Sequence, residues 1–156
     1  MWFLARQGVN VVVCEKGHIA GEQSGRNWGW VRIQGRDTRE IPMMLESMRI
    51  WASLEDATGE DVGFTRGGCF FAVNSQKEIE KYEHWIRIAA EHDIDTRLIS
   101  GPELKQHVQG SAFEWVGAMY TPSDGRAEPH LATPAIARAA SRAGASVLTS
   151  CAVRGP

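Results

Sequence analysis

The sequence predicts an α/β fold that contains a parallel sheet. Residues 9–14 read V-N-V-V-V-C, a short β-branched run bounded by Gly8 and Gly17. Such a run is typical of a strand that is buried on both faces of a parallel sheet. Residues 115–121, an alanine-rich helix and the run 145–150 follow one another as strand, helix and strand. That order is typical of a strand–helix–strand unit in an α/β fold.

The first residues are predicted to be the last turns of a helix. Trp2, Phe3, Leu4 and Ala5 are its final residues, and Gly8 is a glycine stop. In a dinucleotide-binding unit, a first strand and a G-x-G-x-x-G turn precede such a helix. We therefore expect a partial unit that lacks this strand and turn. Met1 is expected to be a truncated start, an artificial boundary or a misplaced initiation site.

An amphipathic helix is predicted for residues 41–57. Pro42 suits its first turn, and Gly59 closes the segment. The apolar side chains at three- and four-residue spacing are Met44, Met48, Trp51 and Leu54. This stripe is interpreted as core rather than as a ligand site. Residues 64–73 follow as one strand or as a bent pair of strands.

A second helix is predicted for residues 75–92. Ser75 and Glu78 have the spacing of a capping box. The expected buried stripe consists of Ile79, Tyr82, Ile86 and Ala89. His84 and His92 are interpreted as residues of the solvated face, because no acid or nucleophile is spaced to meet them.

The C-terminal half is predicted to alternate short strands with helices. Residues 96–99 form a strand, and the pair Ser100 and Glu103 caps a short helix that ends near Val108. The alanine-rich helix starts either at Thr133 as N-cap or nearer Pro129. Its glycine stop is Gly144, and its buried face consists of Ala132, Ile136, Ala139 and Ala143. Residues 145–150 and 151–155 are both expected to be strand pieces.

Composition excludes several classes of function. The net charge of −2 gives no electrostatic reason to expect a nucleic-acid partner, and no apolar stretch has the length of a membrane span. Cys14, Cys69 and Cys151 are interpreted as reduced core cysteines. The histidines are too dispersed for a zinc site, so no metal is expected. A cytoplasmic location is expected.

Three segments resemble the FAD-dependent amine and D-amino acid oxidases, a family that includes glycine oxidase, sarcosine oxidase and D-amino acid dehydrogenase. The segments are L-A-R-Q-G-V-N-V-V-V-C-E-K-G (4–17), Q-S-G-R-N-W-G-W-V-R (23–32) and Y-T-P-S-D-G-R-A-E-P-H-L (120–131). The resemblance covers nearly the whole chain but only the N-terminal part of the longer family members. We therefore expect an N-terminal fragment of such a protein.

The resemblance implies two interleaved domains. Residues 1–40 and 122–156 are expected to form a partial FAD-binding domain, a Rossmann-like parallel sheet without its first strand and G-x-G-x-x-G turn. Residues 41–121 are expected to form part of an α+β substrate domain. The unpaired edge beside residues 9–14 favours dimer pairing of the truncated chain.

Glu15 is the leading candidate for binding the cofactor. It follows directly after the predicted strand 9–14, and an acid at the carboxyl end of such a strand accepts hydrogen bonds from ribose hydroxyls. An acid there also disfavours the 2′-phosphate of NADP. Lys16 and the following loop favour the ribose interpretation. The alternative is a solvated acid that ends a strand.

The resemblance places the other cofactor contacts in one loop and near the C-terminus. They are Gln23 and Ser24 at the pyrophosphate, Asn27, Gly29 and Trp30 along the isoalloxazine edge, and Val153 at the adenine. Arg26 serves either the phosphates or an ion pair. Trp28 and Trp30 either stack near the flavin ring or fill the domain interface.

Arg32 is the candidate for binding the substrate. The resemblance implies that a basic residue at this position helps to hold a substrate carboxylate, a task that suits the planar guanidinium. The alternative is an ion pair with an acid such as Glu40. Asp124 and Glu128 belong to a turn and are interpreted as structural.

The resemblance implies oxidation of the C–N bond of an amine or amino acid by hydride transfer to FAD. No catalytic residue can be named, and those residues are expected beyond residue 156. Two alternatives remain open, a non-catalytic module that binds a nucleotide or a partner, and an inactive truncation. The isolated chain is expected to be inactive and to bind FAD weakly at best.

Overall fold

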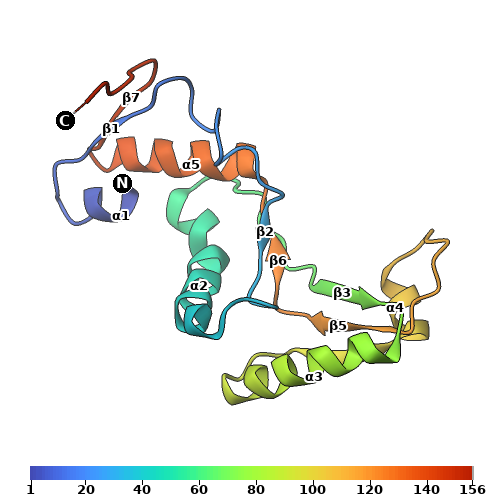
Figure 1. The fold of residues 1–156 in the computed structure, drawn as a ribbon. Helices are drawn as coiled ribbons and strands as arrows, with labels where there is room; N and C mark the ends of the chain where they lie inside the picture. The colour runs from blue at the N-terminus through green and yellow to red at the C-terminus, as the bar shows by residue number, and fades with distance from the viewer. Residues whose placement is uncertain (156) are drawn as a thin grey trace. The chain divides into compact units, whose positions relative to one another are not determined.

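The computed structural model describes residues 1–155, which form two compact units from interleaved stretches of sequence (Figure 1). The first unit contains Met1–Trp30, Arg49–Thr65 and the chain from Arg126 onward. The second contains Val31–Met48 and Arg66–Gly125. Helices and small parallel and antiparallel sheets occur together, so the fold class is α/β. Residues 49–65, which the sequence assigns to the substrate domain, group with the first unit, and the division by function stays a prediction.

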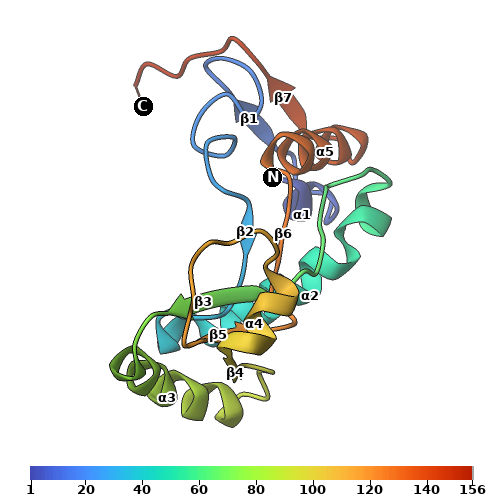
Figure 2. The same ribbon diagram turned by 90° about the vertical axis from the view of Figure 1, so that its right-hand side faces the viewer.

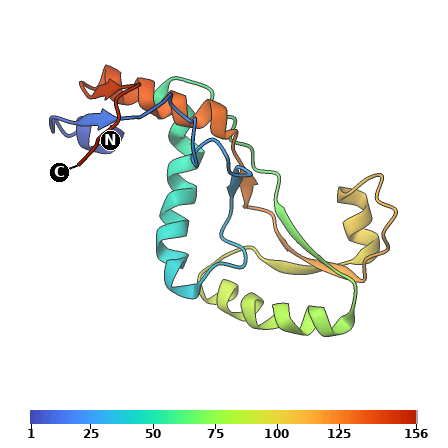
Figure 3. The ribbon, with the colours of Figure 1, turned by 45° about the horizontal axis from the view of Figure 1, so that its top comes forward.

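The first unit contains a short parallel strand pair. Strand β1 (Val12–Cys14) pairs with β7 (Ser146–Leu148), with Val12 opposite Ser146 and Cys14 opposite Leu148. Helix α5 (Pro129–Arg142) leads into β7, and the short helix α1 (Trp2–Ala5) packs against α5 (Figure 3). The predicted parallel arrangement of these strands is confirmed.

Glycines end the helices of the first unit where the sequence predicts. The N–H of Gly8, at φ +77°, donates to the carbonyl of Ala5 at the end of α1. Gly144, at φ +95°, follows α5, and Gly59, at φ +68°, follows α2 (Ile41–Thr58). These conformations are accessible to glycine at little cost, which explains why each helix stops there.

The core of the first unit consists of small and aromatic side chains. Its buried members are Trp2, Ala5, Leu54, Val62, Ala132, Ala135, Ala139, Ala140 and Ala145. Trp51 and Phe64 pack against this cluster, with ring centroids 5.8 Å apart. The predicted stripe of α2 is confirmed, because Met48 and Leu54 are buried and Met44 and Trp51 are half-buried.

The prediction that β1 is buried on both faces is wrong. The side chain of Val12 is 65% exposed and Cys14 is exposed, whereas Val13 between them is half-buried. In the described part of the chain β1 has a single neighbour, β7, and only one face of the pair is covered. Cys14 is therefore not a core cysteine. Cys69 and Cys151 are only half-buried, and all three are free thiols.

The start of α5 agrees with the second of the two predicted alternatives, whereas the last predicted strand needs correction. Helix α5 begins at Pro129, where the N–H groups of Leu131 and Ala132 donate to the carbonyl of Glu128, so Thr133 is not its N-cap and Pro134 lies within the helix. Residues 151–155 form no strand. Ser150 adopts φ +53°, which turns the chain away from an extended path.

The second unit contains a three-stranded antiparallel sheet in the order β3 (Cys69–Val73), β5 (Gly117–Thr121), β4 (Arg97–Ser100). Helices α3 (Gln76–Glu91) and α4 (Gly101–His107) contact this sheet (Figure 2). The second unit also contains a 3₁₀ turn, η1 (Thr38–Glu40). The short strands β2 (Trp30–Val31) and β6 (Gly125–Arg126) pair with each other, and each contains one residue of either unit.

The two predicted capping boxes differ in the structure. The hydroxyl of Ser100 accepts from the N–H of Glu103 at 3.3 Å, as predicted for α4. At α3 the Ser75 side chain makes no cap, and Glu78 accepts from the N–H of Asn74 at 2.8 Å. The sequence did not predict that Trp85 of α3 is buried. Of the predicted stripe only Ala89 is buried as well, whereas the other three members are half-buried.

No helix in the described residues has the length and apolar character needed to cross a membrane.

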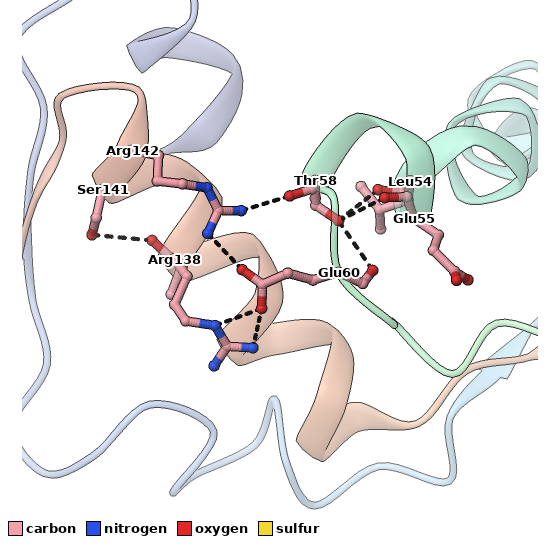
Figure 4. A network of polar contacts seen from close by, with 8 residues as sticks. Leu54, Glu55, Thr58, Glu60, Arg138, Ser141 and Arg142 are labelled. Atoms are coloured by element: carbon pink, nitrogen blue, oxygen red, sulfur yellow. Dashed lines mark hydrogen bonds and ion pairs between the residues drawn. The ribbon is translucent and has the colours of Figure 1, made fainter.

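A charged network joins the segment after α2 to α5 within the first unit (Figure 4). The Glu60 carboxylate accepts from Arg138 Nε at 2.5 Å and from Arg142 Nη1 at 2.7 Å. Arg142 also donates to the carbonyl of Thr58 at 2.5 Å, which caps the end of α2. The two arginines lower the pKa of Glu60, so the network stabilises the ionised carboxylate.

We predict that Glu60→Gln lowers the melting temperature at neutral pH, because the variant loses both ion pairs. The pKa of Glu60 is lower in the folded than in the unfolded protein. The ionised carboxylate therefore stabilises the fold above its unfolded pKa, and this stabilisation is lost as the pH falls through the folded pKa. Thermal unfolding followed by circular dichroism between neutral and acidic pH should show the two proteins converging on acidification. In Glu55→Gln, the control, the replaced side chain points away from the network (Figure 4), and its neutral-pH melting temperature should match the wild type. A decrease in the melting temperature of Glu60→Gln that does not change with pH would contradict this account.

Candidate functional site

Glu15 is held at the carboxyl end of the parallel strand pair by main-chain hydrogen bonds. Its N–H donates to the carbonyl of Leu148 at 2.8 Å, and its carbonyl accepts from the N–H of Cys151 at 2.9 Å. The carboxylate Oε1 accepts from the N–H of Gly17 at 2.8 Å. A carboxylate has about four acceptor positions, so this bond leaves capacity for ribose hydroxyls. The same bond fits the alternative of an acid that ends a strand.

The loop after β1 contains an ion-pair cluster centred on Glu22, which the sequence analysis did not identify. Lys16 Nζ lies 2.9 Å from Glu22 Oε1, and Arg26 Nη1 lies 3.2 Å from Glu22 Oε2. Lys16, and then Arg26, lower the pKa of Glu22. The four-residue spacing of Glu22 and Arg26 was the signal that could have revealed the pair. The ion pair proposed for Arg26 is therefore present, and its phosphate role stays a prediction.

Asn27 organises the turn between the two indoles. Its side-chain amide donates to the carbonyl of Ser24 at 2.8 Å, and its side-chain oxygen accepts from the N–H of Gly29 at 2.8 Å. Both hydrogen bonds are made within the loop. Asn27 thus shapes the backbone at positions 24–29, whatever that backbone contacts.

Gly29 is required by close packing within the chain. It adopts φ +72°, and a Cβ at this position would lie 2.1 Å from the carbonyl oxygen of Ala127. The N–H of Ala127 donates to the Gly29 carbonyl at 2.8 Å, which holds the two segments together. The approach of residue 127 is sufficient to explain this glycine, so its presence does not by itself demonstrate contact with a flavin.

Trp28 and Trp30 expose a large aromatic surface. Their side chains are 82% and 50% exposed, and their ring centroids lie 5.4 Å apart in an edge-to-face arrangement. Aromatic surfaces of this size gain free energy when they are covered. Stacking near a flavin and packing at a domain interface both satisfy this, so the two alternatives from the sequence remain.

The other cofactor candidates of this unit lie on exposed segments. Gln23 and Ser24 are exposed, and Val153 is 72% exposed. The hydrogen bond from Cys151 to Glu15 joins the segment after β7 to the end of β1, so residues 151–153 start beside Glu15. The pairing of the two strands therefore brings together the predicted ribose and adenine contacts.

Arg32 lies in the second unit and is fixed by its own loop. Its guanidinium lies over the ring of Phe71, 5.3 Å from the ring centroid, and donates to the carbonyl of Gln34. The side chain is half-buried. The proposed pairing with Glu40 stays a prediction.

Asp124 is the buried carboxylate that holds the backbone beyond Arg32. It is fully buried, and it accepts from the N–H groups of Ile33 at 2.7 Å and Gln34 at 3.1 Å. Burial raises the pKa of Asp124, while the two backbone donors and the charge of Arg32 act in the opposite direction. Asp124 is therefore a structural residue of the turn, as the sequence suggests, and it also sets the course of the segment that carries Arg32.

Gln34 adds a second buried contact to this arrangement. Its side-chain N–H donates to the carbonyl of Met119 on β5 at 3.0 Å. Among the described residues, no group of three or more histidine, cysteine, aspartate or glutamate side chains could hold a metal ion.

The family model described as FAD dependent oxidoreductase matches residues 1–156. The chain belongs to this family. The family uses FAD, and its members include oxidases and dehydrogenases of amino acids and amines. The predicted family is therefore confirmed.

Individual relatives agree with this assignment. The chain is 25% identical to human mitochondrial sarcosine dehydrogenase, with 99% of this chain and 17% of that protein covered. L-amino acid deaminase from Proteus myxofaciens, solved in complex with anthranilate, matches with a TM-score of 0.91 and 30% identity, covering 97% of this chain and 35% of that one. L-proline dehydrogenase from P. horikoshii matches with a TM-score of 0.90 and 29% identity, covering 99% and 41%. The chain thus spans less than half the length of these relatives.

We predict that Asp124→Asn destabilises the second unit. One oxygen is kept, but the amide NH₂ then faces a backbone N–H that has lost its acceptor, at a cost of about 1–3 kcal/mol. The free energy of unfolding from urea titrations should fall by this amount. Asp56→Asn makes the same change at an exposed position of α2 and should stay within about 0.5 kcal/mol of the wild type. Equal stability of the two variants would contradict the role assigned to Asp124.

Proposed function

We propose that the chain is part of an FAD-dependent oxidoreductase that oxidises the C–N bond of an amine or amino acid by hydride transfer to flavin. The observation that carries the proposal is Glu15, which stands at the carboxyl end of a parallel strand pair in a chain whose whole length matches the family model. The names of the three relatives reported above support the substrate class, since each refers to an amino acid or amine.

We assign the cofactor to the first unit on the basis of its donor and acceptor groups. Glu15 would accept from the ribose hydroxyls, and the backbone near Val153 would face the adenine. Lys16, Arg26, Gln23 and Ser24 would surround the pyrophosphate. Lys16 and Arg26 together carry one positive charge more than Glu22 neutralises, so this three-residue cluster favours an anionic group beside it.

The flavin end would lie along the backbone of Asn27, Gly29 and Trp30. The turn that Asn27 closes keeps this backbone in one conformation, and the exposed indole of Trp30 offers a surface for a planar ring. Bound FAD would supply the hydride acceptor. The protein groups named here would bind and orient it.

The domain assignment follows from this placement. Residues 1–40 and 122–156 would form the partial FAD-binding domain with its Rossmann-like sheet, and residues 41–121 would form part of the substrate domain. The parallel pair β1 and β7 supports the first assignment, and the antiparallel sheet of β3, β5 and β4 supports the second.

Arg32 would hold the carboxylate of the substrate. Stacking on Phe71 and the bond to the Gln34 carbonyl restrict the guanidinium before any ligand arrives, and a restricted group loses less entropy on binding. The bonds from Asp124 to Ile33 and Gln34 fix the backbone on which this restriction depends. The expected ligand is a planar anion that accepts two parallel hydrogen bonds.

A non-catalytic binding module is the second candidate. The paired indoles of Trp28 and Trp30, at 82% and 50% exposure, favour it, because they present aromatic surface that a partner could cover. A partner that covers the indoles should quench their fluorescence without any spectral change in added FAD.

We predict that the purified chain binds FAD with low affinity, seen as saturable quenching of its tryptophan fluorescence. Glu15→Gln should reduce the affinity for FAD by about ten- to a hundredfold. The reason is the loss of charge-assisted hydrogen bonds, which are worth about 1.5–3 kcal/mol. Glu80→Gln, at an exposed position of α3, is the matched control and should bind FAD as the wild type does.

Two outcomes would contradict parts of this proposal. Equal FAD affinity of Glu15→Gln and Glu80→Gln would overturn the ribose role of Glu15. A chain that is folded by circular dichroism and shows no saturable quenching would show that this stretch does not bind FAD by itself.

A further inference from the structure

Two cysteines flank the main-chain contacts of Glu15. Cys14 is the last residue of β1 and lies opposite Leu148 of β7. Cys151 follows β7, and its N–H donates to the carbonyl of Glu15 at 2.9 Å. The N–H of Ser150 donates to the carbonyl of Gly17 at 2.9 Å. These bonds hold the segment after β7 against the end of β1, so the two cysteines are neighbours although most of the chain separates them in sequence.

The neighbouring Cys151 side chain raises the pKa of the Cys14 thiol. Both are free, Cys14 is exposed and Cys151 is half-buried. The hydrogen bonds of Ser150 and Cys151 bring the backbones of the two cysteines together, and neighbouring backbones are the first requirement of a disulfide. Solvent exposure of Cys14 gives a small oxidant access to the pair.

We propose that Cys14 and Cys151 form a redox-active dithiol that closes to an intramolecular disulfide when a peroxide or a small disulfide such as oxidised glutathione is present. This site is independent of the FAD proposal, since it requires only the strand pairing and the two thiols. Its chemical partner is a two-electron thiol oxidant.

The reaction balances with either oxidant. With hydrogen peroxide, one thiolate attacks the O–O bond and becomes a sulfenic acid, and a water is released after proton uptake. The second thiol attacks the sulfenic sulfur, the S–S bond forms, and another water leaves. With oxidised glutathione, one thiolate forms a mixed disulfide and releases one glutathione, and the second thiolate displaces the other. Both cysteine sulfurs are oxidised, and the oxidant takes up two electrons.

The third cysteine provides an internal control. Cys69 begins β3 in the second unit and is half-buried. Burial raises the pKa of its thiol, so little thiolate is present at neutral pH. The neighbouring Cys151 thiol raises the pKa of Cys14 as well, and closure should therefore accelerate as the pH is raised.

The test is oxidation of the reduced, folded chain with oxidised glutathione, followed by alkylation of remaining thiols and peptide mapping by mass spectrometry. We expect one alkylated cysteine, Cys69, and a cross-linked pair of peptides that contain Cys14 and Cys151. Cys69→Ser should form the same bridge, whereas Cys14→Ser and Cys151→Ser should not. The oxidised wild type should also melt at a higher temperature than the reduced protein, because the bridge closes a long loop.

Three results would contradict the proposal. Three alkylated cysteines, a stable glutathione adduct on Cys14, or a bridge that includes Cys69 would each overturn the proposal. Circular dichroism of each serine variant confirms that it is folded before oxidation. Oxidation in concentrated urea is a further control. In the unfolded chain the preference for a bridge between Cys14 and Cys151 should disappear. If the preference persists, the fold does not create it.

Discussion

The pairing of β1 with β7 is the contact on which the candidate cofactor site depends. Three residues of each strand align in parallel, and the bonds continue beyond the strands from Glu15 to Leu148 and from Cys151 to Glu15. Because carboxyl ends of parallel strands meet at one edge, the loop after β1 and the segment after β7 leave the sheet together. The buried alanines of α5 belong to the core cluster against which Val11, next to β1, packs.

Main-chain hydrogen bonds also determine where the candidate residues of the second unit lie. The buried carboxylate of Asp124 receives two backbone N–H groups, and Gln34 is tied to Met119 by its side chain. Arg32 then rests on Phe71 and on the Gln34 carbonyl. In both units the residues with functional chemistry are supported by rigid backbone contacts, which is how a binding group is restricted before its ligand arrives.

The sequence predicts best where a local rule governs the structure. Helices α2 and α5 end at Gly59 and Gly144 because only a flexible backbone turns there cheaply, and Ser100 caps α4 because its hydroxyl reaches the nearby N–H of Glu103. It fails where distant contacts decide. The exposure of Val12 depends on which elements cover the sheet, and the burial of Trp85 depends on packing with the second unit's sheet. Glu22 was missed because the ion pair considered for Arg26 was given no partner, although Glu22 lies four residues before Arg26.

The central claim is that the chain binds the adenosine half of FAD at the end of β1 and the flavin along residues 27–30. Backbone amide chemical shifts of the isotope-labelled chain, recorded by NMR during addition of FAD, test it most directly. The account predicts that the amides that shift belong to residues 15–17, 21–30 and 151–153, while those of the sheet formed by β3, β5 and β4 stay unchanged. Shifts concentrated in that sheet, with residues 15–30 unaffected, would contradict it.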